Sequence, residues 1–303
     1  MRFMQHKQEA YWFYRYLSIF YDKLVNPLFW TEHMREKALD RGDWTDSEHL
    51  QVIDVGSGTG FTTEGIVDRV PAKNVTCVDQ SPHQMKHAKA KSALQDCTFK
   101  VGDAENIPYP TDHFDRYVSA GSIEYWPNPQ QGLNEAYRVI KPGGKALMIG
   151  PIEPQNPISK FIANAWMLFP PEEDYHRYFK DAGFIDTEWV YVRPHWQKNE
   201  RYGIALIGTK PAAGTSPNAE AVAQQSQHSS DNTMSIGRRI LFFFRLLVGS
   251  VFGFLFIPMA LIAHLVAPLR GIEGPKQPLN SWQIGVLSGI AILVIGLVVW
   301  LAR

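Results

Sequence analysis

A glycine-rich turn constrains the fold of this chain more than any other feature. Residues 52–55 form a short strand-like run, and Gly56, Gly58 and Gly60 follow it at alternate positions. Glycine lets a backbone turn sharply and approach a ligand closely, and the free N–H groups at the start of a following helix attract an anionic group. The pattern therefore predicts a strand, a ligand-binding turn and a helix in direct succession.

The same alternation continues over residues 51–150. Strand-like runs cover 51–56, 75–79, 97–103, 114–120 and 144–150, and helix-like runs cover 61–70, 82–94 and 129–140. Strands that alternate with helices of about 10 to 15 residues indicate βαβ units. We therefore predict an α/β, Rossmann-like domain with a parallel, doubly wound sheet. Ligands in such sheets bind beyond the carboxyl ends of the strands, so the candidate site residues follow each strand.

Charge and cysteine content exclude several classes of function. The chain carries 30 Lys+Arg against 30 Asp+Glu, which removes the general electrostatic argument for nucleic-acid binding. The balance is uneven, because residues 1–210 carry 24 against 27 and residues 211–303 carry 6 against 3. The two cysteines, Cys77 and Cys97, are too few for a disulfide framework and lack the spacing of a structural zinc site, so we predict no metal.

Composition divides the chain into three parts. Residues 1–210 are predicted to form the globular domain, with residues 1–45 as a helical lid. Residues 211–238 are rich in Ala, Gln, Ser and Asn and are predicted to be a flexible linker, because such a segment buries too little apolar surface to offset its ordering entropy. The N-terminal stretch is aromatic and mixed in charge, unlike a signal or transit peptide.

Residues 239–303 are predicted to be a membrane anchor. Two apolar segments, 246–268 and 284–302, are about long enough to cross a hydrocarbon core of roughly 30 Å. The first contains Pro258 and His264, so a kinked, re-entrant or interfacial segment is an alternative, and two buried core helices are a second alternative. The flanking basic residues favour a hairpin with the domain on the cytoplasmic or stromal side.

The turn and the strand ends indicate a particular cofactor. A dinucleotide fingerprint expects glycine where Phe61 stands. Asp79 ends the second predicted strand, where it can accept both ribose hydroxyls, and Asp103 follows the third, where it can accept from an adenine amine. Ribose and adenine without phosphate fit S-adenosylmethionine, with its ammonium near Asp54. The predicted cofactor contacts are Asp54, Gly56, Ser57, Gly58, Gly60, Asp79, Gln80, Asp103, Ala104 and Ser119. The alternative is that Asp79 and Asp103 only cap turns.

By these residues the chain resembles the class I S-adenosylmethionine-dependent methyltransferases, and residues 103–108 and 141–144 are similar to the quinone C-methyltransferase branch. Residues 116–132 and 165–184 resemble more closely the family of 2-methyl-6-phytyl- and 2-methyl-6-solanyl-1,4-hydroquinone methyltransferases of tocopherol and plastoquinone synthesis. The similarity runs over residues 2–215 and resumes at the first apolar segment. It implies a membrane-bound enzyme of a chloroplast inner envelope or thylakoid, or of a cyanobacterial membrane.

The resemblance also implies a reaction and its participants. A methyl group is transferred to a ring carbon of a prenylated hydroquinone, and the candidates for accepting the phenolic proton are Glu124, His6 and Tyr21, with Tyr14, Tyr125 and His195 also considered. The channel for the prenyl tail is expected at Trp126, Trp166 and Phe169, together with Met167 and Leu168, although such residues at helical spacing also form ordinary cores.

Two other functions are compatible with the sequence. One is a methyltransferase of the same fold that acts on a sterol or another small molecule. The other is a membrane-tethered nucleoside-binding protein without activity. The sequence leaves open the preference for phytyl or solanyl tails, the identity of the base and the oligomeric state.

Overall fold

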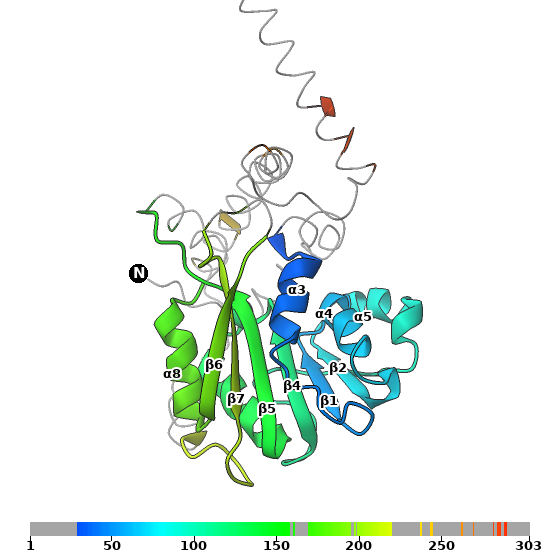
Figure 1. The fold of residues 1–303 in the computed structure, drawn as a ribbon, viewed down its shortest axis with the longest axis vertical. Helices are drawn as coiled ribbons and strands as arrows, with labels where there is room; N and C mark the ends of the chain where they lie inside the picture. Colours follow the sequence, from blue (N-terminus) through cyan, green and yellow to red (C-terminus); the bar gives the residue numbers. More distant parts are fainter. Residues whose placement is uncertain are drawn as a thin grey trace, which may run out of the picture.

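The computed structural model describes residues 29–157, 160, 169–194, 197 and 199–219, with isolated positions between 237 and 289. Over these residues a seven-stranded sheet forms with the order β3-β2-β1-β4-β5-β7-β6 (Figure 1). The strands are β1 (Val52–Val55), β2 (Val75–Asp79), β3 (Thr98–Val101), β4 (Phe114–Ala120), β5 (Ile140–Pro151), β6 (Ile185–Val192) and β7 (Gly203–Thr209). The five predicted strands are all present, and β5 begins earlier than predicted.

The prediction of an all-parallel sheet is wrong for one side of the sheet. Strands β1 to β5 pair in parallel, but β7 pairs antiparallel with both β5 and β6. The reason is the length of the connection between the last two strands. Only residues 193–202 lie between the end of β6 and the start of its neighbour β7, and a parallel crossover needs about a dozen residues or more, so the two strands run antiparallel.

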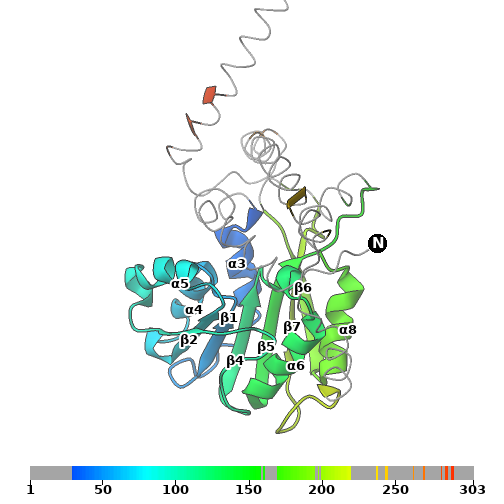
Figure 2. The ribbon, with the colours of Figure 1, turned by 180° about the vertical axis from the view of Figure 1, so that it is seen from behind.

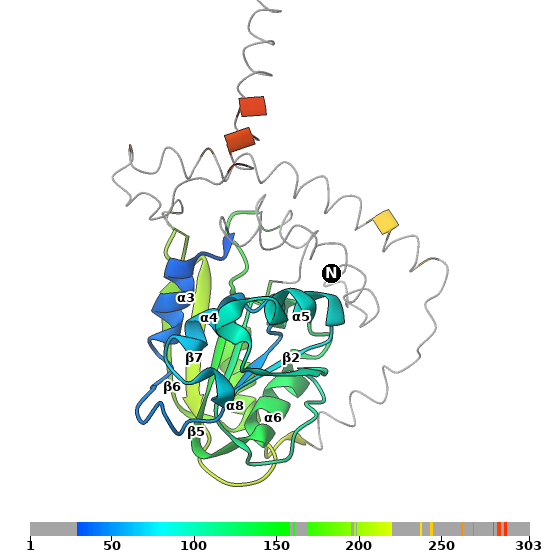
Figure 3. The ribbon, with the colours of Figure 1, turned by 90° about the vertical axis from the view of Figure 1, so that its right-hand side faces the viewer.

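Helices cover both faces of the sheet. Helices α3 (Glu32–Leu39), α4 (Phe61–Val67) and α5 (Pro82–Lys89) pack on one face, and α6 (Pro129–Val139) and α8 (Glu172–Ala182) pack on the other (Figures 1 and 2). Short 3-10 turns occur at Ala72–Asn74, Ser92–Leu94 and Ile123–Tyr125. Figure 3 shows the same helices and strands after a 90° turn about the vertical axis of Figure 1.

Alternation along the strands builds the two cores. Val52 packs with α3 and α4, whereas Ile53 and Val55 pack on the α6 and α8 side, because successive side chains of a strand point to opposite faces. The helices begin where the sequence supplies caps. Ser81 accepts a hydrogen bond from Gln84 N at the start of α5, and Asn128 accepts one from Gln131 N at the start of α6.

The folded body extends past the predicted boundary at residue 210. Ser216 is buried and donates to Asn134 Oδ1 at 3.1 Å, and the Asn218 side-chain amide donates to Asp181 O at 2.6 Å. Residues 211–219 therefore belong to the domain, whereas the sequence assigned them to the linker. Small polar residues can dock on a folded surface through hydrogen bonds without burying large side chains, which composition does not reveal.

A buried lysine fixes this extension. Lys210 is 0% exposed, and its Nζ lies 2.5 Å from Asp112 Oδ1 and 2.7 Å from Gly214 O. The same Nζ lies 4.7 Å from the centroid of the Tyr137 ring, a cation–π distance. The segment that follows β7 is therefore held to the domain by a buried lysine whose ammonium group has hydrogen-bond partners.

Among the described residues, no helix is both long and apolar enough to cross a bilayer. The apolar segments 246–268 and 284–302 lie outside the described residues except at single positions, as does the linker beyond residue 219. The anchor and the remaining linker stay predictions.

Replacing Lys210 with methionine should lower the free energy of unfolding by about 2 to 3 kcal/mol, because the variant leaves Asp112 near a buried site without its cation. The matched control is Lys160→Met. Lys160 is half exposed and pairs with Glu153, so its loss should cost less than about 1 kcal/mol. Urea unfolding of both variants measures the difference, and equal values for the two would contradict the role assigned to Lys210.

Candidate functional site

A cavity lies beyond the carboxyl ends of β1, β2, β3 and β4. It encloses about 940 Å³, counting the part that opens to solvent. Its lining comes from loops that follow the strands and from the start of α3. The lining residues are Trp30, Gly56, Ser57, Gly58, Thr59, Phe61, Thr62, Asp79, Gln80, Ser81, Gln84, Gly102, Asp103, Ala104, Glu105, Ala120, Ser122, Tyr125, Trp126 and Pro127.

The glycine turn forms one wall of the cavity. Gly58 has a φ of +54°, and a Cβ there would lie 2.5 Å from Gln84 Oε1, so a larger residue would be strained and would clash. Gly60 has a φ of +83° and occupies the N-cap position of α4. A Cβ at Gly60 would meet Leu94 at 2.5 Å, which places this glycine against the core.

Asp79 joins the turn to the next strand. Its Oδ2 accepts from Gly58 N at 2.8 Å, and its Oδ1 accepts from Ser81 N at 2.7 Å. Burial raises the pKa of Asp79 to about 6, although both hydrogen bonds act to lower it. One carboxylate therefore fixes two loops of the cavity while it also lines the cavity.

Asp103 combines the same two roles. Its Oδ1 accepts from Glu105 N at 2.9 Å, and the residue lines the cavity beside Ala104. Asp79 and Asp103 therefore each cap a turn and also line the cavity, so capping a turn does not exclude a role in binding. The predicted residues that the structure brings together at the cavity are Gly56, Ser57, Gly58, Asp79, Gln80, Asp103, Ala104 and Trp126.

Three predicted contact residues, Asp54, Gly60 and Ser119, lie behind the cavity wall. Asp54 is 0% exposed, and its Oδ2 accepts from Thr63 Oγ1 at 2.6 Å. Burial raises the pKa of Asp54 to about 7. Ser119 is also 0% exposed, and its Oγ lies 2.8 Å from that of Ser122, which lines the cavity in its place. Both residues belong to strands, so the sheet buries them beneath the loops.

Four aromatic residues, Trp30, Phe61, Tyr125 and Trp126, line the cavity, and the sequence predicted only some of them as functional. Tyr125 and Trp126 follow β4, where the sequence predicted functional residues, and the Trp126 ring packs so close to Gly132 that a Cβ there would lie 2.4 Å from it. For Phe61 the sequence indicated only a departure from the dinucleotide fingerprint, not a place in the cavity lining. Trp30 comes from a distant segment, and no local pattern marks it.

Glu124 faces a different part of the same sheet edge. Its neighbours Ser122 and Tyr125 line the cavity, but Glu124 does not. It is 5% exposed, and its Oε2 has no hydrogen-bond partner among the described residues. Burial raises its pKa to about 8. Burial also raises the pKa of Tyr175 and of Tyr202, and the charge of Glu124 raises both further. Since Tyr175 donates to Pro151 O at the end of β5, the carboxyl group lies toward β5 and β7.

Seven of the candidate residues lie outside the described part of the chain: His6, Tyr14, Tyr21, Trp166, Met167, Leu168 and His195. Phe169 is described and half-buried, and it is not part of the cavity lining. Within the described ranges, no group of three or more His, Cys, Asp or Glu side chains could hold a metal ion.

The fold matches known methyltransferases. Residues 53–148 match a family model described as a methyltransferase domain. A Haloferax volcanii complex of the Trm112 methyltransferase activator with a methyltransferase superposes with a TM-score of 0.53 at 21% identity, over 68% of this chain and 99% of that one. A Haemonchus contortus phosphoethanolamine N-methyltransferase in complex with S-adenosyl-L-methionine gives 0.52 at 18% identity, over 67% and 57%. The predicted doubly wound α/β architecture is confirmed.

Plant relatives are much more similar in sequence. The Arabidopsis thaliana protein named 2-methyl-6-phytyl-1,4-hydroquinone methyltransferase, chloroplastic, is 55% identical over 221 residues, which are 71% of this chain and 65% of the relative. The chain thus spans slightly less than two thirds of that protein. An Oryza sativa subsp. japonica protein of the same name, numbered 2, is 51% identical over 255 residues, which are 82% of this chain and 71% of the relative. The chain belongs to the family of 2-methyl-6-phytyl-1,4-hydroquinone methyltransferases.

Proposed function

We propose that the chain is an S-adenosylmethionine-dependent C-methyltransferase that methylates the ring of 2-methyl-6-phytyl- or 2-methyl-6-solanyl-1,4-hydroquinone in tocopherol and plastoquinone synthesis. The observation that carries this proposal is the identity of 51–55% to relatives named for the phytyl reaction. The name "chloroplastic" of these relatives supports a chloroplast as the location.

The cavity residues suit the proposed methyl donor. The Asp79 carboxylate would accept from the ribose hydroxyls, Asp103 and Ala104 would face the adenine, and the glycine turn would face the methionine moiety. Two buried polar atoms support this fit, because Ser57 Oγ and Asp54 Oδ1 have no hydrogen-bond partner within the described part of the chain. The unpaired carboxyl oxygen beneath the turn favours a nearby cationic group. When bound, the donor supplies an electrophilic methyl group on a sulfonium.

The acceptor is proposed to lie between the aromatic residues of the cavity lining and the part of the sheet edge that Glu124 faces. Trp126 would contact the acceptor, with Trp166 and Phe169 along the prenyl tail. Holding the ring carbon in line with the methyl group accounts for much of the acceleration, since positioning contributes roughly 7–11 kcal/mol in favourable cases.

Removing the phenolic proton raises the electron density at the ortho carbon that is methylated. Glu124 is proposed as the group that accepts this proton, and its burial next to Tyr125, which lines the cavity, supports the role. Its raised pKa of about 8 makes the carboxylate a stronger base than an exposed glutamate. His6 and Tyr21 remain further proposals for the same step.

The function is tested with the full chain in lipid vesicles that contain the phytyl or the solanyl hydroquinone, with S-adenosylmethionine labelled in its methyl group. We expect one labelled methyl group on the acceptor ring, and Asp79→Ala should weaken binding of S-adenosylhomocysteine in calorimetry. Label transfer to a sterol or another small molecule but to neither hydroquinone would favour the alternative enzyme. Absence of donor binding would favour a nucleoside-binding protein without activity.

Glu124→Gln should lower kcat by about 10²- to 10⁴-fold, the usual contribution of a general base. A base acts in its unprotonated form, so the wild-type rate should rise with pH through about 8, and the variant should lose this rise. A variant that keeps the wild-type pH profile would exclude Glu124 as the base and leave His6 and Tyr21.

The stability of Glu124→Gln serves as the control for folding. Burial favours the protonated carboxyl of Glu124, so this group causes no loss of stability below its ordinary pKa of 4.5 and a growing loss as the pH rises toward about 8. Gln carries no charge and lacks this loss. The variant should therefore be at least as stable as the wild type at pH 9 in urea unfolding, so that a loss of rate is not a loss of fold.

Residues 239–303 are proposed to anchor the enzyme at the membrane that holds the prenylated acceptor, with the linker reaching the domain beyond residue 219. The full chain should stay in the membrane pellet after an alkaline carbonate wash. Arginine at both Leu293 and Val294 should increase the extracted fraction, because each charge costs roughly 2.5–3.5 kcal/mol at the centre of a spanning helix. Arginine at both Ala221 and Ala223 in the linker is the matched control. Complete extraction of the wild type would overturn the proposal.

A further inference from the structure

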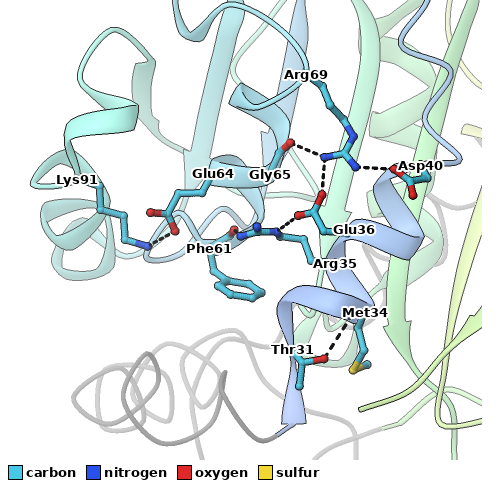
Figure 4. Close-up of polar contacts among 10 residues, drawn as sticks. All are labelled: Thr31, Met34, Arg35, Glu36, Asp40, Phe61, Glu64, Gly65, Arg69 and Lys91. Atoms are coloured by element: carbon cyan, nitrogen blue, oxygen red, sulfur yellow. Dashed lines mark hydrogen bonds and ion pairs between the residues drawn. The ribbon is translucent and has the colours of Figure 1, made fainter. Parts of the chain in front are cut away.

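The junction between α3 and α4 contains an arginine that holds a residue of the cavity wall in two ways. Arg35 Nη1 donates to Phe61 O at 2.8 Å, and its guanidinium carbon lies 4.8 Å from the centroid of the Phe61 ring (Figure 4). Arg35 is only 8% exposed. A planar guanidinium can donate to a carbonyl and stack on a ring at once, which an ammonium cannot do equally well.

Both ends of this junction reach the cavity. Phe61 is the first residue of α4 and directly follows the glycine turn, and its side chain lines the cavity. Trp30 lines the cavity from the other side of the junction, immediately before Thr31, which caps α3 by accepting from Met34 N. Two aromatic residues of the cavity lining, Trp30 and Phe61, therefore flank this junction.

The two helices approach closely because α4 has a glycine at the contact. A Cβ at Gly65 would lie 2.6 Å from Leu39 Cδ1 and 2.7 Å from Arg35 Nε. Arg35 Nε also donates to Glu36 Oε1 at 2.7 Å. The carboxylate partly neutralises the arginine, so Arg35 can hold the wall with little net repulsion of a cationic ligand.

A second arginine holds the same junction without contacting the cavity. Arg69 donates to Gly65 O at 2.9 Å, and it forms ion pairs with Glu36 at 2.8 Å and Asp40 at 2.6 Å (Figure 4). Arg69 is not part of the cavity lining. The junction thus contains a buried arginine that contacts the wall and a half-buried arginine, with similar partners, that does not.

We propose that Arg35 is a positioning residue for the methyl donor. It fixes Phe61 in the cavity wall through the main-chain carbonyl and the ring, so that donor affinity depends on a side chain that lies behind the wall. The inference rests on the proposed function, because it takes S-adenosylmethionine as the occupant of the cavity.

The test compares Arg35→Gln, Arg35→Lys and Arg69→Gln in the full chain. Calorimetry measures the Kd of S-adenosylhomocysteine, and kinetics give kcat and the KM of each substrate. Arg35→Gln should raise this Kd and the KM for the donor by about five- to tenfold, which is comparable to the contribution of one ordinary hydrogen bond. The KM of the acceptor and kcat at saturating donor should change less than about twofold, and Arg35→Lys should restore part of the affinity.

Arg69→Gln is the matched control, because it removes comparable contacts from the same junction. It should lower the Tm and leave the donor Kd unchanged. If both glutamine variants weaken donor binding equally, or neither does, Arg35 has no positioning role and the inference is overturned. A wild-type chain that does not bind S-adenosylhomocysteine would instead refute the proposed function.

A double substitution keeps the proposal testable if Arg35→Gln does not fold. Phe61→Leu removes the ring on which the guanidinium stacks. The effect of Arg35→Lys on donor Kd should then be smaller in the Phe61→Leu background than in the wild type. The ring contact that lysine weakens is already absent there, whereas the Phe61 main-chain carbonyl is common to both backgrounds. Strictly additive effects would contradict the proposal.

Discussion

The carboxylate of Asp79 is the contact on which the candidate site depends. It accepts from Gly58 N in the glycine turn and from Ser81 N at the start of α5, so one side chain ties the loops after β1 and β2 together. Its partial burial carries a desolvation cost that raises its pKa to about 6. Because those two N–H groups satisfy the carboxylate before any ligand binds, the strand ends keep a fixed geometry for the rest of the cavity.

The sequence predicted the parallel half of the sheet because local patterns suffice there. Three of the five predicted strands are followed by a turn and a predicted helix, and βαβ units of this kind are almost always right-handed. The other half depends on pairing that periodicity does not encode. Residues 203–209 are almost wholly buried and give only an apolar run, and residues 185–189 are exposed at the sheet edge, so neither segment reveals its direction.

The same distinction separates the site residues that could be predicted from those that could not. Asp79, Gln80, Asp103 and Ala104 follow predicted strands, and their place in the cavity follows from that position alone. Trp30 reaches the cavity only because α3 docks on α4, which is a tertiary contact. The position of Glu124 depends on a 3-10 turn in which consecutive side chains diverge, and residue order cannot show which of them faces the cavity.

Three carboxyl groups with raised pKa values lie along one edge of the sheet, and this arrangement links stability to binding. Burial raises the pKa of Asp79 to about 6, of Asp54 to about 7 and of Glu124 to about 8, and each ionised form costs folding free energy. A ligand that donates hydrogen bonds or brings positive charge to Asp79 and Asp54 offsets this cost on the donor side. Glu124 faces another part of the edge, so donor binding can favour ionisation of the first two carboxyls while Glu124 keeps the high pKa that a proton acceptor for a phenol needs.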